Sequence, residues 1–138
     1  RGLSFGILGV GAGNEMSGIN IGGLGAGAGR NIRGVTFGLL GAGAGNGISG
    51  LTIGGLGVGA GKELHGVTLS LGSIKVEEGD TVGLNVSAYN TIHGTVNGVS
   101  VGIINYSYEL NGVQIGLINY VRDNPPARKL LPIANWHF

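Results

Sequence analysis

The chain has 138 residues, including 32 glycines and no cysteine, and its net charge at neutral pH is +1. Charged residues make up 11% of the chain and hydrophobic residues 42%, which excludes a highly charged disordered polymer. Because no Lys/Arg-rich run is present, no nucleic-acid partner is predicted, and without cysteine there is no disulfide framework and no thiolate metal site.

Residues 1–138 are expected to form one domain, since the composition does not shift sharply along the chain. The first part, residues 1–65, contains regular segments of 16 residues that align without a gap and begin at Gly2, Gly18, Gly34 and Gly50. Their shared pattern is G-φ-x-φ-G-φ-L-G-φ-G-A-G-x-x-φ-x, where φ is apolar or glycine. So many glycines disfavour helix, because each interior glycine costs about 0.5 to 1 kcal/mol relative to alanine.

Each segment opens with two apolar residues on either side of a small polar residue, an alternation typical of a half-buried strand. We expect the apolar pair Leu3 and Phe5 to point inward. The same alternation places inward Ile19 and Ile21, Val35 and Phe37, Leu51 and Ile53, Val67 and Leu69, Leu84 and Val86, Val99 and Val101, and Val113 and Ile115. The small polar residues would form an outward surface ladder of Ser4, Asn20, Thr36, Thr52, Thr68, Asn85, Ser100 and Gln114.

One chemical type at one position of every unit is what stacked parallel coils produce. The sequence therefore predicts an all-β protein, a glycine-rich parallel β-solenoid with about eight coils of about 16 residues. A weaker period of 32 residues, in which Phe5 matches Phe37, fits pairs of coils and also pairs of antiparallel hairpin strands. Charged residues that mark exposed turns between the units are Glu15, Arg30, Arg33, Lys62 and Glu63.

Residues 66–123 form degenerate repeats that keep the G-φ-x-φ opening. Their first unit gathers Glu77, Glu78 and Asp80, and paired carboxylates can divide the roles of general acid and general base. A protruding, solvated loop is favoured, and such a loop is a candidate contact surface. The tyrosines of this part predict a stacked ladder, with a carbohydrate platform as the alternative; they are Tyr89, Tyr106, Tyr108 and Tyr120.

Residues 124–138 interrupt the repeat and predict a C-terminal capping segment. Pro125 and Pro126 end the preceding strand, and a terminal strand follows. Trp136 and Phe138 are large enough to cover the open end of a thin core. The alternation of these aromatic residues with polar ones also fits the last strand of an outer-membrane β-barrel, so a component of such a barrel is an alternative and a membrane partner stays open.

No nucleophile, base and orienting group can be named together, so we predict no enzymatic activity, no catalytic residue, no cofactor and no small-molecule substrate. His65, His93 and His137 lack the spacing of metal ligands, and the glycine-rich turns lack the aspartates of calcium-binding repeats. No metal site is predicted.

The segment 98–120, GVSVGIINYSYELNGVQIGLINY, resembles a family of bacterial surface-repeat proteins built from tandem G-[LV]-Q-[IL]-G-L-[IVL]-N units. The match is best from Gly112 to Tyr120, and the earlier units lack the Gln and Asn positions. The resemblance implies an extracellular or cell-envelope location, the outer membrane included, and supplies no catalytic residue.

Together these observations predict a non-enzymatic structural or surface module of the bacterial envelope. Because the chain begins in mid-pattern at Arg1, we expect end-to-end self-association with like molecules. Regularly spaced threonine surfaces resemble ice-binding faces, so ice binding through the outward ladder is a third hypothesis.

Overall fold

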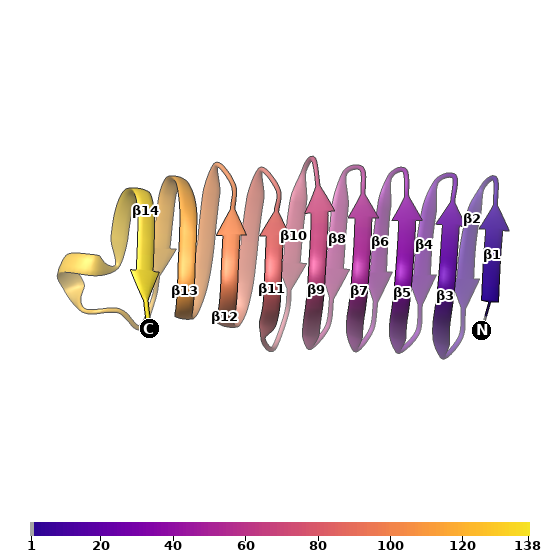
Figure 1. Ribbon diagram of the computed structural model, residues 1–138, viewed down its shortest axis with the longest axis horizontal. Helices are drawn as coiled ribbons and strands as arrows, with labels where there is room; N and C mark the ends of the chain where they lie inside the picture. The colour runs from indigo at the N-terminus through magenta and orange to yellow at the C-terminus, as the bar shows by residue number, and fades with distance from the viewer. Residues whose placement is uncertain (1) are drawn as a thin grey trace.

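The computed structural model describes residues 2–138, and one sheet of 14 strands makes up most of them. In Figure 1 the coils stand side by side in one row, with their long strands in front and their short strands behind. The long strands are β1 (Gly2–Gly6), β3 (Glu15–Gly22), β5 (Asn31–Gly38), β7 (Gly47–Gly54), β9 (Glu63–Ser70) and β11 (Thr81–Val86). The short strands are β2 (Gly9–Ala12), β4 (Gly25–Ala28), β6 (Gly41–Ala44), β8 (Gly57–Ala60) and β10 (Ser73–Val76).

The later part of the chain follows the same path with longer strands. β12 (Tyr89–Val101) pairs with the short β10 through its first residues and with the long β11 through its last ones, so it runs around one corner of the coil. β13 (Ile104–Val121) follows β12 in the same way. A 3₁₀ turn, η1 (Pro126–Arg128), then leads to β14 (Leu130–His137).

Neighbouring coils pair in parallel, one unit apart along the chain. Gly18 lies opposite Gly34, and the pairings that link β1 to β13 are all parallel. The predicted parallel β-solenoid is therefore confirmed, and it makes about seven turns. Antiparallel pairing of neighbouring repeats is wrong for this part of the chain, because the hydrogen-bonded neighbours are the same positions of successive units.

One glycine in each long strand fixes the path of the backbone. Gly18, Gly34 and Gly50 have φ angles of 108°, 108° and 113°, a conformation that residues with side chains rarely adopt. These glycines stack directly on one another, and a Cβ atom on Gly50 would fall on the backbone carbonyl of Gly34. At this position the backbones of successive coils can therefore lie in contact only because both coils have glycine there.

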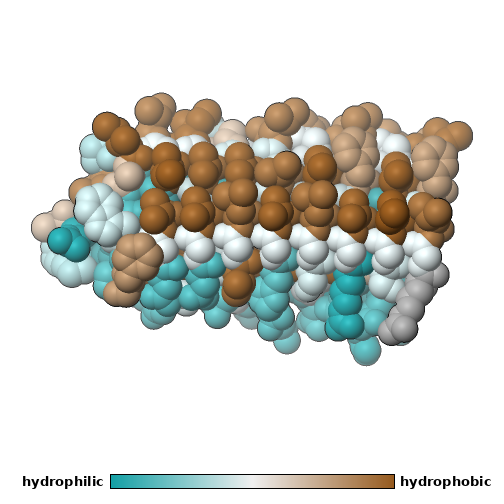
Figure 2. Space-filling view, viewed as in Figure 1, coloured by the Kyte–Doolittle hydropathy of each residue, from teal (hydrophilic) through white to brown (hydrophobic). Residues whose placement is uncertain are grey.

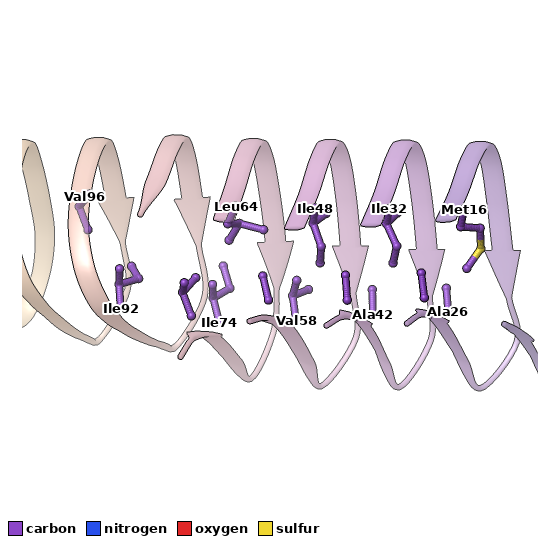
Figure 3. Packing of buried hydrophobic residues seen from close by; sticks show 14 of the residues in the cluster. Met16, Ala26, Ile32, Ala42, Ile48, Val58, Leu64, Ile74, Ile92 and Val96 are labelled. Atoms are coloured by element: carbon purple, nitrogen blue, oxygen red, sulfur yellow. The ribbon is translucent and has the colours of Figure 1, made fainter. Parts of the chain in front are cut away.

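The core is a thin layer between the long and short strands. Near its start, a typical long strand contributes one large apolar side chain, and Figure 3 shows four of them in a row: Met16, Ile32, Ile48 and Leu64. The short strands place smaller side chains opposite them, namely Ala26, Ala28, Ala42, Ala44, Val58 and Ala60. The interior of the early coils, from β3 to β8, therefore holds one large residue per coil and otherwise small ones.

The polar ladder lies inside the coil, so its predicted outward position is wrong. Seven of its members are at most 2% exposed, and Ser4 in the first coil is half-buried. The buried members are Asn20, Thr36, Thr52, Thr68, Asn85, Ser100 and Gln114. The reason is the phase of the strand, because β3 begins at Glu15 and its inward positions are Met16, Gly18 and Asn20. Ice binding through this row is excluded with it, because the row does not reach the surface.

The apolar pairs that we expected in the core point outward instead. Leu3 is 79% exposed and Phe5 75% exposed, and Ile19 and Val35 in the following coils are 44% and 42% exposed. The predicted alternation is present, but the apolar residues lie outside the coil and the polar residues lie inside it.

The C-terminal segment caps the stack through its backbone rather than through the two predicted aromatic side chains. β14 pairs antiparallel with β13, so the next parallel coil cannot add at this position. Trp136 is 52% exposed and Phe138 is 89% exposed, so neither fills the end of the core. Asn135 does point inward, and its amide donates a hydrogen bond of 3.0 Å to the carbonyl of Arg128.

Candidate functional site

The outward side of the long strands and the corners that follow them form one surface, which we call the apolar face. Its first two columns are the apolar pairs, from Leu3 and Phe5 to Val113 and Ile115. Exposed corner residues add to it: Ile7, Leu8, Leu24, Leu39, Leu40, Leu56, Leu71, Ile103, Leu117 and Ile118. Figure 2 shows this face as a brown band that runs along the whole molecule.

A row of glycines separates the apolar face from a polar edge. The polar edge consists of the outward residues at the start of the long strands, among them Glu15, Arg33, Glu63 and His65. Figure 2 shows the teal residues gathered on this side, below the brown band. The outer side of the long strands is therefore amphipathic across the strands, and this division repeats from coil to coil.

The apolar face is corrugated along its corner. The residue that directly follows each long strand alternates over five coils between a large apolar residue and glycine. In order, these residues are Ile7, Gly23, Leu39, Gly55 and Leu71. An open hollow of about 480 Å³ lies over Gly55, between Leu39 and Leu71. A Cβ atom on Gly55 would fall on the carbonyl oxygen of Leu39, so the fold itself keeps the hollow open.

The side of the coil formed by the short strands differs between the early and late coils. In β4, β6 and β8 the outward residues are glycines, which leave a flat backbone surface. In the late coils tyrosines take these positions, and the Tyr106 ring stacks on Tyr120 with centroids 5.4 Å apart and planes 2° apart. The two ring faces that meet in this pair are therefore not free to stack on a sugar.

A second aromatic group lies beside this stack. His93 and Tyr108 have ring centroids 5.4 Å apart, and the Arg122 guanidinium lies 3.7 Å from the centre of the Tyr108 ring. Arg122 Nε donates a 2.9 Å hydrogen bond to Asp123 Oδ1. This bond lowers the pKa of Asp123 below its ordinary value of 3.8 and raises the pKa of Arg122.

The acidic turn places its three carboxylates in two different surroundings. Glu77 accepts a 3.2 Å hydrogen bond from Lys75, whereas Asp80 accepts one of 2.8 Å from the backbone N–H of Thr95. Glu78 is exposed. Within residues 2–138 no group of three His, Cys, Asp or Glu side chains is placed to hold a metal ion. Glu77 therefore lies apart, whereas Glu78 and Asp80 line one hollow together with Glu63.

The structure contains a second interior ladder that the sequence analysis missed. The Asn90 amide donates to Asn105 Oδ1, and the Asn105 amide donates to Asn119 Oδ1, both at 2.7 Å. All three side chains are at most 1% exposed. The signal was available, because asparagine recurs here at the spacing of the coil.

Comparison of the chain with family models, curated proteins and solved structures finds no match. The similarity of residues 98–120 to bacterial surface-repeat proteins therefore stays a prediction. In the described chain, 2–138, no helix has the length and apolar character required to cross a membrane.

Proposed function

We propose that the protein is a non-enzymatic structural module of the bacterial cell surface or envelope, and that it acts by docking its apolar face on another surface. The observation that carries this proposal is the apolar face itself, whose columns contain no charged residue in the described coils. Soluble monomers rarely expose a contiguous apolar patch larger than a few hundred Å², and larger ones mark interaction sites.

The positions of these residues support a binding role over a packing role. Val35 and Leu51 lie outside the coil, so polar residues there would cost the core nothing. Outward positions of a solvated sheet are ordinarily polar, as they are at the polar edge of the same strands. The restriction of Val, Ile, Leu and Phe to one side indicates that this side is covered when the protein works.

The envelope location rests on the similarity of residues 98–120 to bacterial surface-repeat proteins. Fractionation of the cells that make the protein tests it directly. We expect the protein in the envelope fraction or in the medium, and recovery in the cytoplasmic fraction would overturn this part of the proposal.

Docking by the apolar face is tested by the fluorescence of a dye that binds exposed apolar surface, together with retention on a hydrophobic column, both at a protein concentration low enough for the chain to be monomeric. Leu51→Lys places a charge on the face, and Ser49→Lys places the same charge on the polar edge of the same strand. We expect the Leu51 variant to lose dye binding and retention, and the Ser49 variant to keep both. Equal behaviour of the two variants would contradict docking by this face.

A further inference from the structure

We infer that the partner of the apolar face is a second copy of this chain, packed face to face to form a two-sheet sandwich. This inference rests on the proposed function, because it names the surface on which the apolar face docks. Three observations carry it: the size of the face, its corrugation and the charges beside it.

The size of the face matches what a stable dimer requires. Eight strands at about 4.8 Å spacing give a length near 40 Å, and three columns give a width of about 20 Å. Each copy would therefore bury about 800 Å², which is the usual contribution of each partner to a specific interface. Two sheets with apolar faces pack at about 10 Å, with the side chains of both faces interdigitated.

The corrugation makes the face complementary to itself. Knobs at Leu39 and Leu71 flank the hollow over Gly55, so knobs and hollows follow each other at the spacing of one coil. A two-fold axis parallel to the strands, placed between β7 and β9, sets the two coil axes antiparallel. It brings Leu71 of each copy over Gly55 of the other.

This arrangement also uses the whole face. Four strands that carry the apolar pairs lie on each side of the axis: β1, β3, β5 and β7 on one side, and β9, β11, β12 and β13 on the other. Leu71 is 85% exposed, so it can leave solvent on association without any change in the monomer. The interface is isologous, in which each copy offers both the knob and the hollow.

The charges beside the face favour a protein partner over an anionic lipid surface. The nearest outward positions of the described coils are Ser17, Arg33, Ser49, His65, Val82, Asn97 and Asn111. One arginine in that row, with Glu15 and Glu63 two positions earlier on their strands, does not form the Lys/Arg cluster that attracts acidic headgroups. A neutral, mixed rim suits a copy of the same surface.

The test measures the association state of the full chain by analytical ultracentrifugation, with two alanine variants. Leu71→Ala removes the knob, and Lys75→Ala removes an exposed side chain of the short strand β10, on the other side of the coil. We expect a dimer whose dissociation constant rises at least about tenfold in Leu71→Ala and stays unchanged in Lys75→Ala. Circular dichroism checks that both variants keep the fold.

A cross-link tests the position of the axis. The chain has no cysteine, so a single introduced thiol can react only with its copy in another molecule. In the dimer the two Leu71 positions lie one coil apart, about 4.8 Å along the axis, and about 10 Å apart across the two sheets, which is too far for a direct disulfide but within reach of a short bismaleimide. Leu71→Cys should therefore form a covalent dimer with a short bismaleimide, whereas Lys75→Cys, on the short-strand side of the coil, should not.

The outcomes separate this inference from the proposed function. A monomer that floats with neutral phosphatidylcholine vesicles would overturn the dimer and leave docking by the apolar face intact. A dimer that Leu71→Ala does not weaken, or that Leu71→Cys does not cross-link, would overturn the face-to-face arrangement. A monomer that binds neither vesicles nor the apolar dye would overturn both.

Discussion

The regular repeats of residues 2–65 and the degenerate repeats of residues 66–121 form the same type of coil with different side chains. In β4 and β6 the short strands place alanine inside and glycine outside, so both surfaces of the strand are nearly smooth. In residues 89–121 the same positions include the buried asparagines Asn90, Asn105 and Asn119 and the outward tyrosines Tyr89, Tyr106 and Tyr120. The late strands β12 and β13 are longer, but parallel pairing and the stacked glycines continue through them, which indicates that the coil depends on these two features.

The two interior ladders differ in how well their buried polar groups are bonded. In the late coils the Asn105 amide donates to Asn119 Oδ1 at 2.7 Å and to the carbonyl of Ile115 at 2.9 Å. In the early coils Asn20 donates to Thr36 at 3.4 Å, and Thr52 Oγ1 is buried without a hydrogen-bond partner among residues 2–138. Among residues 2–138 the long-strand ladder also has unpaired buried atoms in the late coils, at Asn85, Ser100 and Gln114. Stability should therefore be gained from side chains mainly in the asparagine ladder.

The largest effect should come from the element that both parts share. Gly50→Ala places a Cβ on the carbonyl of Gly34 at a φ of 113°, so it should destabilise the protein by more than about 3 kcal/mol. Chemical denaturation measures this loss.

A matched change on the other side of the coil is the control. A Cβ on Gly43 meets only the oxygen of Gly59 at 3.7 Å, so Gly43→Ala should leave stability unchanged or raise it by up to about 1 kcal/mol. Gly98→Ala, in the degenerate part, should be as harmful as Gly50→Ala. A mild effect of Gly98→Ala would mean that the degenerate part does not depend on its stacked glycines as the regular part does.

The next largest effect should separate the two parts. Asn105→Ala leaves the buried amide of Asn90 and the buried oxygen of Asn119 without their partner, which should cost about 2 to 3 kcal/mol. Thermal unfolding gives the measurement. The control is Asn111→Ala, since Asn111 is exposed and donates only a 3.2 Å bond to Asn97, and it should change stability by less than about 0.5 kcal/mol.

The repeat made the fold predictable. The 16-residue spacing and the recurring glycines predict which residues stack, and they do so without any tertiary information, because neighbours in a parallel stack are equal positions of successive units. The position of the cap was also predictable, since Pro125 and Pro126 break the pattern. How the cap works was not, because Asn135 rather than Trp136 turns inward.

The inward side of the long strands was predicted wrongly because the strand was taken to begin at its glycine. β3 begins at Glu15, and the alternation continues through Gly18, so Glu15 and Ile19 lie on the same outward side. Met16 and Asn20 therefore share the interior. A charged residue in a strand marks its solvent side, and Glu15 was the signal that could have corrected the assignment.

A smaller effect, of opposite sign, should come from the early polar ladder. Thr52→Val removes the buried hydroxyl that has no partner within residues 2–138 and keeps the shape of the side chain, so stability should rise by about 1 kcal/mol. Thr36→Val is the control, because the Thr36 hydroxyl accepts the bond from Asn20 and its loss leaves that amide unpaired. Equal gains in stability in both variants would show that the 3.4 Å hydrogen bond from Asn20 to Thr36 contributes nothing to stability.

The smallest effect concerns a charged pair at the surface of the late part. The hydrogen bond from Arg122 lowers the pKa of Asp123, so its carboxylate should titrate below 3.8 in an NMR pH series. Since the folded pKa is the lower one, any stability from this pair is present above pH 3.8 and is lost as the pH falls through the folded value. Arg122→Gln should raise the midpoint toward 3.8, and Lys129→Gln should raise it less, because Lys129 acts only through its charge. If Arg122→Gln does not change the titration midpoint of Asp123, Arg122 and Asp123 do not pair in solution.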